Sequence, residues 1–118
     1  MKYKFIIHEN KTFWGKVYHI ITSDGYGHLQ VSIENDTDDI LYLTGLSVYK
    51  DFRKQGIGTM LLKKAEEIGK ENNILYIKLN IEKNNLKLSE NPLYNFYINN
   101  GYKYLTEDNE YIYFIKYI

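Results

Sequence analysis

The chain has 118 residues, 15 basic and 15 acidic side chains, no cysteine and a single proline. This length predicts one domain, and the ordinary hydrophobic content argues against disorder. The lack of cysteine excludes disulfides, thiolate metal sites and a cysteine nucleophile, and the zero net charge argues against nucleic acid as the main partner. No apolar run approaches the ~20 residues of a membrane span and no signal peptide opens the chain, so we expect a cytoplasmic protein without a membrane partner.

The first part of the chain predicts three β-strands. Alternating apolar residues predict a strand over residues 2–8, and two further strands over 16–22 and 28–35 flank the turn sequence SDGYG, which is typical of a β-hairpin. The link over 9–15 is short, and we expect at most a helical turn or two there.

The next predicted strand, over 41–48, changes the face of its apolar residues part-way along. These residues fall on odd positions up to Leu43 and on even positions from Leu46. A shift of one residue turns every following side chain to the opposite face unless an extra residue is absorbed, and glycine inside a strand often marks such a point. We therefore predict a β-bulge at Thr44-Gly45, which bends the strand away from its neighbour and leaves backbone groups unpaired.

A helix over 58–72 and a strand over 74–81 follow. Apolar residues at helical spacing predict the buried side of the helix: Ile57, Leu61, Ala65 and Ile68. Alternation predicts the inward side of the strand: Leu75, Ile77, Leu79 and Ile81. A strand, a helix and a strand of these lengths predict two parallel neighbours joined by a right-handed crossover.

The end of the chain predicts a second helix and a closing hairpin. Pro92 suits the first helical position, Asn91 suits the cap before it, and Gly101 provides a C-terminal stop. Two short strands over 102–106 and 110–118 complete the prediction. The chain (1–118) is thus expected to be a single α+β domain with a mixed sheet.

Two glycines, Gly56 and Gly58, stand where the first helix begins, although glycine weakens a helix by roughly 0.5–1 kcal/mol relative to alanine. A helix N-terminus has unpaired N–H groups and about half a positive charge, and glycine lets phosphate oxygens approach the backbone. Together with Arg53 and Lys54 the glycines predict an anion site. The ending of a nucleotide P-loop is missing, and Leu61 stands where a dinucleotide fingerprint needs its third glycine.

The sequences LTGLSVYKDFRKQGIGTMLLKKAEE and NFYINNGYKY resemble two motifs of the GNAT N-acetyltransferase superfamily. In that family a bulged strand ends in Leu-x-Val and precedes R/Q-x-x-G-x-G/A, and an aromatic-Tyr pair precedes a Gly-aromatic pair. The resemblance extends from about Gly15 to the C-terminus. It implies an acyl-CoA N-acyltransferase fold, with a mixed, mostly antiparallel sheet, a bulged and splayed strand pair and two main helices.

The resemblance implies an acetyl-CoA-dependent N-acetyltransferase. Backbone amides from Gln55 to Thr59 would hold the pyrophosphate, the backbone of Leu46 and Val48 would pair with the pantetheine arm, and the acetyl group would lie beside the strand over 74–81. The implied coenzyme-binding residues are Leu46, Ser47, Val48, Arg53, Lys54, Gln55, Gly56, Ile57, Gly58, Thr59, Asn91 and Tyr94. Asn91 is displaced by one residue from the position of the asparagine in the family pattern.

Acetyl transfer to an amine requires a neutral amine, a held thioester and a proton for the departing thiolate. The resemblance points to Tyr97 as the general acid, since a phenol of pKa ~10 carries its proton at neutral pH, with Tyr94 as the alternative. The base is left open between Glu34, Glu82 and Asn80, which lie on outward faces of predicted strands. His8, His19 and His28 are expected to be surface or strand residues, without metal ligation.

The acceptor follows from the short link over 9–15, where family members usually carry two helices that cover the acceptor site. An open site favours a protein or peptide amine over a small metabolite. A lysine amine is free base in only about one molecule in 2,500 at pH 7, and an α-amine in roughly 10–20%, so a lysine acceptor asks more of the base. Two alternatives stay open: a catalytically silent GNAT-like module that binds acyl-CoA or a protein partner, and a structural domain without coenzyme. The prediction also leaves open whether the chain is a monomer or a homodimer.

Overall fold

Seven strands form a single sheet in the order β1-β2-β3-β4-β5-β7-β6. The computed structural model describes residues 4–35, 39–49 and 56–118. The strands are β1 Phe5–Thr12, β2 Gly15–Thr22, β3 Gly27–Glu34, β4 Ile40–Val48, β5 Tyr76–Glu82, β6 Lys103–Glu107 and β7 Tyr111–Tyr117. The helices are α1 Ile57–Glu71, the short 3₁₀ helix η2 Leu88–Glu90 and α2 Pro92–Asn99. The predicted α+β fold with a mixed sheet is confirmed.

The link over 9–15 contains no helical turn. β1 continues to Thr12, and Phe13 and Trp14 form a tight turn into β2, so that the backbone groups of the link find partners in a longer antiparallel ladder. Gly15 is required here because a Cβ at this position would lie 2.0 Å from the carbonyl oxygen of Ile33.

The predicted bulge in β4 is confirmed. Gln30 of β3 lies opposite Gly45, but the next residue, Val31, lies opposite Leu43, so Thr44 is the extra residue. Its hydroxyl donates a hydrogen bond to the carbonyl oxygen of Gln30 at 3.1 Å, which fixes the bulge.

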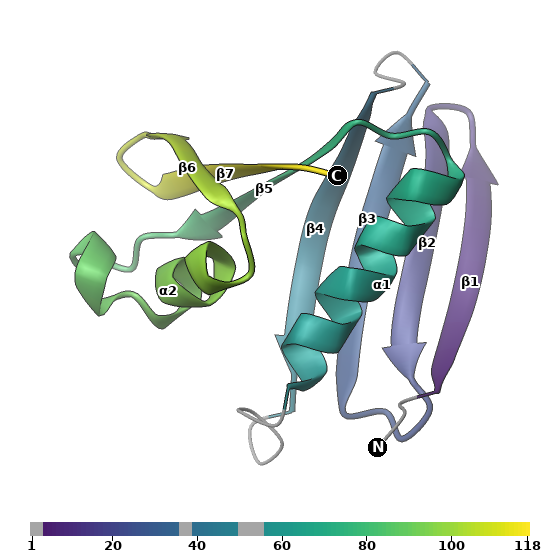
Figure 1. Cartoon of the computed structure of the whole chain (residues 1–118), viewed down its shortest axis with the longest axis horizontal. Coiled ribbons are helices and arrows are strands. Elements are labelled where there is room, and N and C mark those ends of the chain that lie inside the picture. Colours follow the sequence, from purple (N-terminus) through teal and green to yellow (C-terminus); the bar gives the residue numbers. More distant parts are fainter. Residues whose placement is uncertain (1–3, 36–38, 50–55) are drawn as a thin grey trace.

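β4 and β5 diverge after a short parallel stretch. Only Ile40–Tyr42 of β4 pair with Tyr76–Lys78 of β5, whereas β5 pairs with β7 from Tyr76 to Glu82. The sheet therefore consists of two halves, β1 to β4 and β5-β7-β6, which separate beyond Tyr42 (Figure 1).

α1 lies across β2, β3 and β4, and α2 lies beside the second half of the sheet (Figure 1). The predicted residues of α1 are buried, together with Leu62 and Gly69. The expectation for Leu75 is wrong, because its side chain is 55% exposed and that of Ile74 is buried instead. Asn73 adopts a left-handed conformation with φ 60° after the helix, so the strand period starts only at Tyr76.

The opposite face of the sheet, here called the open face, has no helix over it within the described ranges. Residues alternate across a strand, so Leu29 and Val31 of β3 face α1 and Gln30 faces the open side. By the strand registers, His19, Tyr42 and Lys78 share this face with Gln30. None of the described helices is long and apolar enough to cross a bilayer.

Candidate functional site

The N-terminus of α1 presents backbone amides that are not bonded within the helix. Gly56 is the N-cap, with φ 81° and ψ 3°, and the amide of Met60 donates the first helical hydrogen bond to its carbonyl oxygen at 3.0 Å. The amides of Ile57, Gly58 and Thr59 precede that bond and have no partner within the helix. Among the described residues, no side chain caps this end and no acidic residue lies in its first turn. This end of α1 therefore has backbone donors without a partner in the helix, and a positive potential.

The two glycines at this end of α1 are required for different structural reasons. Gly56 adopts a left-handed conformation that costs other L-residues roughly 1–2 kcal/mol. Gly58 has an ordinary helical backbone, but a Cβ there would lie 2.9 Å from Cζ of Phe96 on α2. The sequence prediction explained both glycines by the approach of phosphate. The contact between Gly58 and Phe96 was missed, because no local pattern links two residues so far apart in the chain.

The predicted contacts of Arg53, Lys54 and Gln55 with phosphate remain predictions, because residues 50–55 lie outside the described ranges.

The end of β4 directs backbone groups into the gap beside β5. In an antiparallel ladder, alternate residues bond to the partner strand and the residues between them face away. The amide of Tyr49 donates to the carbonyl oxygen of Tyr26 at 2.6 Å, and Val48 lies opposite Gly27. This alternation turns the backbone polar groups of Leu46 and Val48 toward β5. The side chain of Ser47, between them, is exposed on the open face.

A cavity of about 410 Å³ lies where β4 and β5 separate. Its lining residues are Tyr42, Leu43, Thr44, Lys78, Leu79, Asn80, Leu105, Thr106, Tyr113 and Phe114. They come from β4, β5, β6 and β7, so the divergence of the two half-sheets creates the cavity. Lys78 is the one charged side chain among these described lining residues. Lys78 alternates with the inward residues of the predicted strand over 74–81 and is therefore expected to face outward, but no motif identified it as a site residue.

Tyr97 lies next to this cavity, on the helix side of the sheet. Its ring is 4% exposed and packs against Phe96, Tyr102 and Phe114, with ring centroids 5.2–5.6 Å apart. Phe114 also lines the cavity, so one side chain contacts both. Burial raises the pKa of Tyr97 to about 12, which keeps its phenol protonated at neutral pH.

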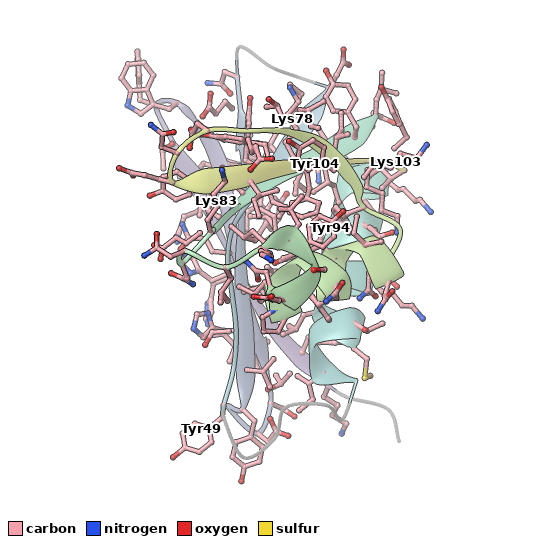
Figure 2. All side chains as sticks on the ribbon, turned by 90° about the vertical axis from the view of Figure 1, so that its left-hand side faces the viewer. Tyr49, Lys78, Lys83, Tyr94, Lys103 and Tyr104 are labelled. Carbon is pink, nitrogen blue, oxygen red and sulfur yellow. The ribbon has the colours of Figure 1, made fainter. Side chains whose placement is uncertain are left out.

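Tyr94 also packs against Phe114, with ring centroids 5.7 Å apart, and remains half-buried. Figure 2 shows Tyr94 near Tyr104 in the centre of the molecule, with Lys78 above them and Tyr49 at the far lower end.

Asn91 has a structural role at the start of α2, and its predicted contact with the coenzyme remains a prediction. Its side chain is 2% exposed, accepts hydrogen bonds from the amides of Leu93 and Tyr94, and donates one to the carbonyl oxygen of Glu82. Both ends of the amide group therefore have partners. The cap predicted for α2 is confirmed, and the hydrogen bond from Asn91 to Glu82 additionally connects the start of this helix to the end of β5.

The two acidic candidates for the base do not line the cavity. Glu34 ends β3 opposite Gly15, beyond the paired part of β4 and β5 and away from their gap. Glu82 ends β5 and contributes to a separate cavity of about 340 Å³ with Asn84, Glu110 and other residues. Of the three candidates, only Asn80 lines the larger cavity.

The three histidines lie on strands, as expected. His8 lies opposite His19 on β1 and β2, and His28 lies on β3. In the described ranges, no group of three or more His, Cys, Asp or Glu side chains has the geometry to hold a metal ion.

Comparisons with known proteins agree with this geometry. The model of the acetyltransferase (GNAT) family matches residues 4–102. A search of curated proteins by sequence found no match. Among solved structures, PaiA N-acetyltransferase from Thermoplasma acidophilum, in complex with coenzyme A, has a TM-score of 0.70 and 23% identity over 86% of this chain and 60% of PaiA. This chain therefore spans less than two thirds of that protein.

Two further solved structures share the fold at lower identity. A GNAT family acetyltransferase from Elizabethkingia anophelis, with acetyl-CoA bound, has a TM-score of 0.71 and 13% identity over 97% of this chain and 98% of that protein. Nourseothricin acetyltransferase has a TM-score of 0.72 and 15% identity, over 96% and 84%. The family match covers most of the sequence, and the splayed strands and the glycine N-cap of α1 agree with it, so this chain belongs to the GNAT family of acetyltransferases.

Proposed function

We propose that this chain transfers the acetyl group of acetyl-CoA to a primary amine of a protein or peptide. The observation that carries the proposal is the cavity between β4 and β5, which lies beside Tyr97 and is lined in part by Tyr42 and Lys78 of the open face. The coenzyme is supported by family membership and by the structural neighbours that hold coenzyme A or acetyl-CoA.

The coenzyme would span two elements. Amides of Gly56, Ile57, Gly58 and Thr59 would donate to the pyrophosphate, because they lie at the positive end of α1. Ile57 can contact the pyrophosphate only through its backbone amide, because its side chain is buried at 1% exposure. The pantetheine arm would then run along β4, where Leu46 and Val48 turn their backbone groups toward β5, and would carry the thioester to the cavity.

The chemistry begins when a neutral amine attacks the thioester carbonyl carbon. A C–N bond forms, the C–S bond breaks, and the proton lost by the nitrogen balances the proton gained by the thiolate. With a pKa of about 12 in Tyr97 and ~8.5 for a thiol, complete proton transfer from the phenol is uphill by roughly 5 kcal/mol. Tyr97 would therefore stabilise the departing sulfur mainly by donating a hydrogen bond, and would not ionise for long.

The acceptor is proposed to be large because Tyr42 and Lys78, which line the cavity, lie on the open face. β1 and β2 are joined by the turn at Phe13 and Trp14, so no helix covers the sheet between them. A protein or peptide segment can approach this face without displacing a described helix.

The test is to incubate the purified chain with acetyl-CoA and a peptide library, and to measure released coenzyme A thiol and acetylated peptides by mass spectrometry. Acetylated peptides in step with released thiol would support the proposal. Tyr97→Phe should lower this rate while leaving coenzyme binding unchanged. Acetylation of small amines alone would contradict the proposed acceptor class.

A second candidate function is a GNAT-like module that binds acyl-CoA or a protein partner without turnover. One observation favours it: the described lining residues of the cavity include no carboxylate and no histidine to act as a base. Tight binding of acetyl-CoA, measured by calorimetry, with no thiol release from any acceptor would support this alternative.

A further inference from the structure

Lys78 lies at the inner end of the gap between β4 and β5. It pairs with Tyr42 in the last register position before the two strands separate, and both residues line the cavity. The start of α1 and Tyr49 lie at the other end of β4 (Figure 2). A thioester that enters the gap from the α1 end would therefore point toward Lys78. Lys78 lies on the open face, from which the acceptor would approach.

The charge of Lys78 has no carboxylate partner among the described residues. The ion pairs there involve Lys64, Lys83 and Lys116, each with a glutamate. The neighbours of Lys78 on the open face are Tyr42, Tyr76, Asn80 and Ile115, none of which carries a charge. Its ammonium lies 5.7 Å from the ring centroid of Tyr76, a cation–π contact that orients the side chain without neutralising it.

We propose that Lys78 selects an acceptor with a carboxylate close to its α-amine, namely a peptide whose first residue is Asp or Glu. The inference rests on the proposed acetyl transfer to peptides and names the class of peptide. Lys78 is half-buried, and an ammonium without a carboxylate partner among the described residues can bind an incoming carboxylate by a charge-assisted hydrogen bond. Because Lys78 lines the same cavity that would receive the amine, the carboxylate and the amine must belong to the same residue or to adjacent ones.

The lack of a base in the lining also favours an α-amine. Without a carboxylate or a histidine among the described lining residues, the acceptor must reach its neutral form largely by itself. An α-amine does so far more readily near pH 7 than a lysine side chain does.

The experiment compares peptides that are identical except for their first residue, Asp against Asn and Glu against Gln. Free aspartate is tested beside them, because it is a small molecule that carries the same amine and carboxylate. The rate is followed by release of coenzyme A thiol, and the acetylated nitrogen is located by mass spectrometry. Binding of the N-acetylated Asp and Asn peptides to the chain saturated with coenzyme A is measured by calorimetry, so that one readout does not depend on turnover. The variants are Lys78→Gln, Lys78→Arg and, as a matched control, Lys70→Gln at the exposed end of α1.

We expect kcat/KM to be about 10-fold higher for the Asp peptide than for the Asn peptide, the size that a hydrogen bond to a charged group gives. Lys78→Gln should abolish this preference, Lys78→Arg should largely keep it, and Lys70→Gln should leave it unchanged. Acetylation of free aspartate in preference to every peptide would show that the acceptor is not a peptide N-terminus. Acetylation located on lysine side chains would overturn the proposed acceptor in the same way.

Equal rates with the Asp and Asn peptides, or a preference that survives Lys78→Gln, would overturn the role of Lys78 while leaving acetyl transfer itself intact. If no peptide is acetylated, the proposed function fails, and the calorimetry still decides the inference. Tighter binding of the acetylated Asp peptide that depends on Lys78 would support the selection, and equal binding of the two peptides would overturn it.

Discussion

Gly58 at the start of α1 and Phe96 on α2 lie so close together that a Cβ on Gly58 would be 2.9 Å from Cζ of Phe96. Phe96 in turn packs against Tyr97, with ring centroids 5.2 Å apart. The helix end proposed to bind pyrophosphate is thus connected through one aromatic ring to the proposed general acid. A change at Gly58 should therefore affect both binding and chemistry.

Gly58→Ala should weaken coenzyme binding and lower kcat, because the ring of Phe96 must move and α2 with it. The same change improves helix propensity by roughly 0.5–1 kcal/mol, so thermal stability should fall little or not at all. The double variant Gly58→Ala/Phe96→Leu should recover most of the lost affinity, which calorimetry with coenzyme A can measure. If the double variant is no better than the single one, the contact with Phe96 does not explain Gly58.

Gly56→Ala should lower stability and weaken coenzyme binding together. Its φ of 81° imposes a cost of roughly 1–2 kcal/mol on alanine, and relief of that strain moves the amides at the start of α1. Gly25, in the turn between β2 and β3, has the same φ of 81° and, like Gly56, no described atom within 4 Å of an added Cβ, so Gly25→Ala is a matched control. Thermal unfolding should show similar losses for the two variants. Only Gly56→Ala should raise the Kd for coenzyme A.

Tyr97→Phe should lower kcat by about 10²-fold or more, the size expected for loss of a proton donor, with little change in the Kd for acetyl-CoA. The active form is the protonated phenol, and its pKa is raised to about 12, so activity should persist through pH 10 and fall only as pH rises toward 12. Below that range the rate should rise with pH as the acceptor amine loses its proton. A pH profile that falls with an apparent pKa near 10 would contradict the buried site of Tyr97.

Tyr102→Phe should leave stability unchanged or raise it. The hydroxyl of Tyr102 is buried without a hydrogen-bond partner among the described residues, and such a group costs roughly 1–3 kcal/mol. Phenylalanine keeps the ring that packs against Tyr97 and lies 5.4 Å from the ammonium of Lys116. Denaturant unfolding measures the change. A clear loss of stability would mean that the hydroxyl has a partner of its own in solution.

Local patterns in the sequence predicted the features that local physics determines. The change of face around Thr44 identified the bulge, because side chains alternate strictly along a strand. Asn91 and Pro92 identified the start of α2, since a cap and a first-turn proline act within a few residues. The separation of β4 and β5 followed from the bulge together with the family resemblance.

Features that depend on distant parts of the chain could not be predicted in this way. Leu75 alternates correctly with its successors, but the left-handed turn at Asn73 places Ile74 in the core instead. The cavity around Lys78 needs four strands from different parts of the sequence, so no single motif identifies its lining. The close approach of Gly58 to Phe96 depends likewise on how α1 and α2 pack together.

The most direct test of the central claim is an amide ¹H–¹⁵N NMR titration of the chain with coenzyme A. If the start of α1 binds the diphosphate, the amide signals of Gly56, Ile57, Gly58 and Thr59 should shift strongly and saturate together with that of Leu46. The amide signals of β1 should not shift. A well-dispersed spectrum whose α1 signals do not move at saturating coenzyme A would contradict diphosphate binding at the start of α1.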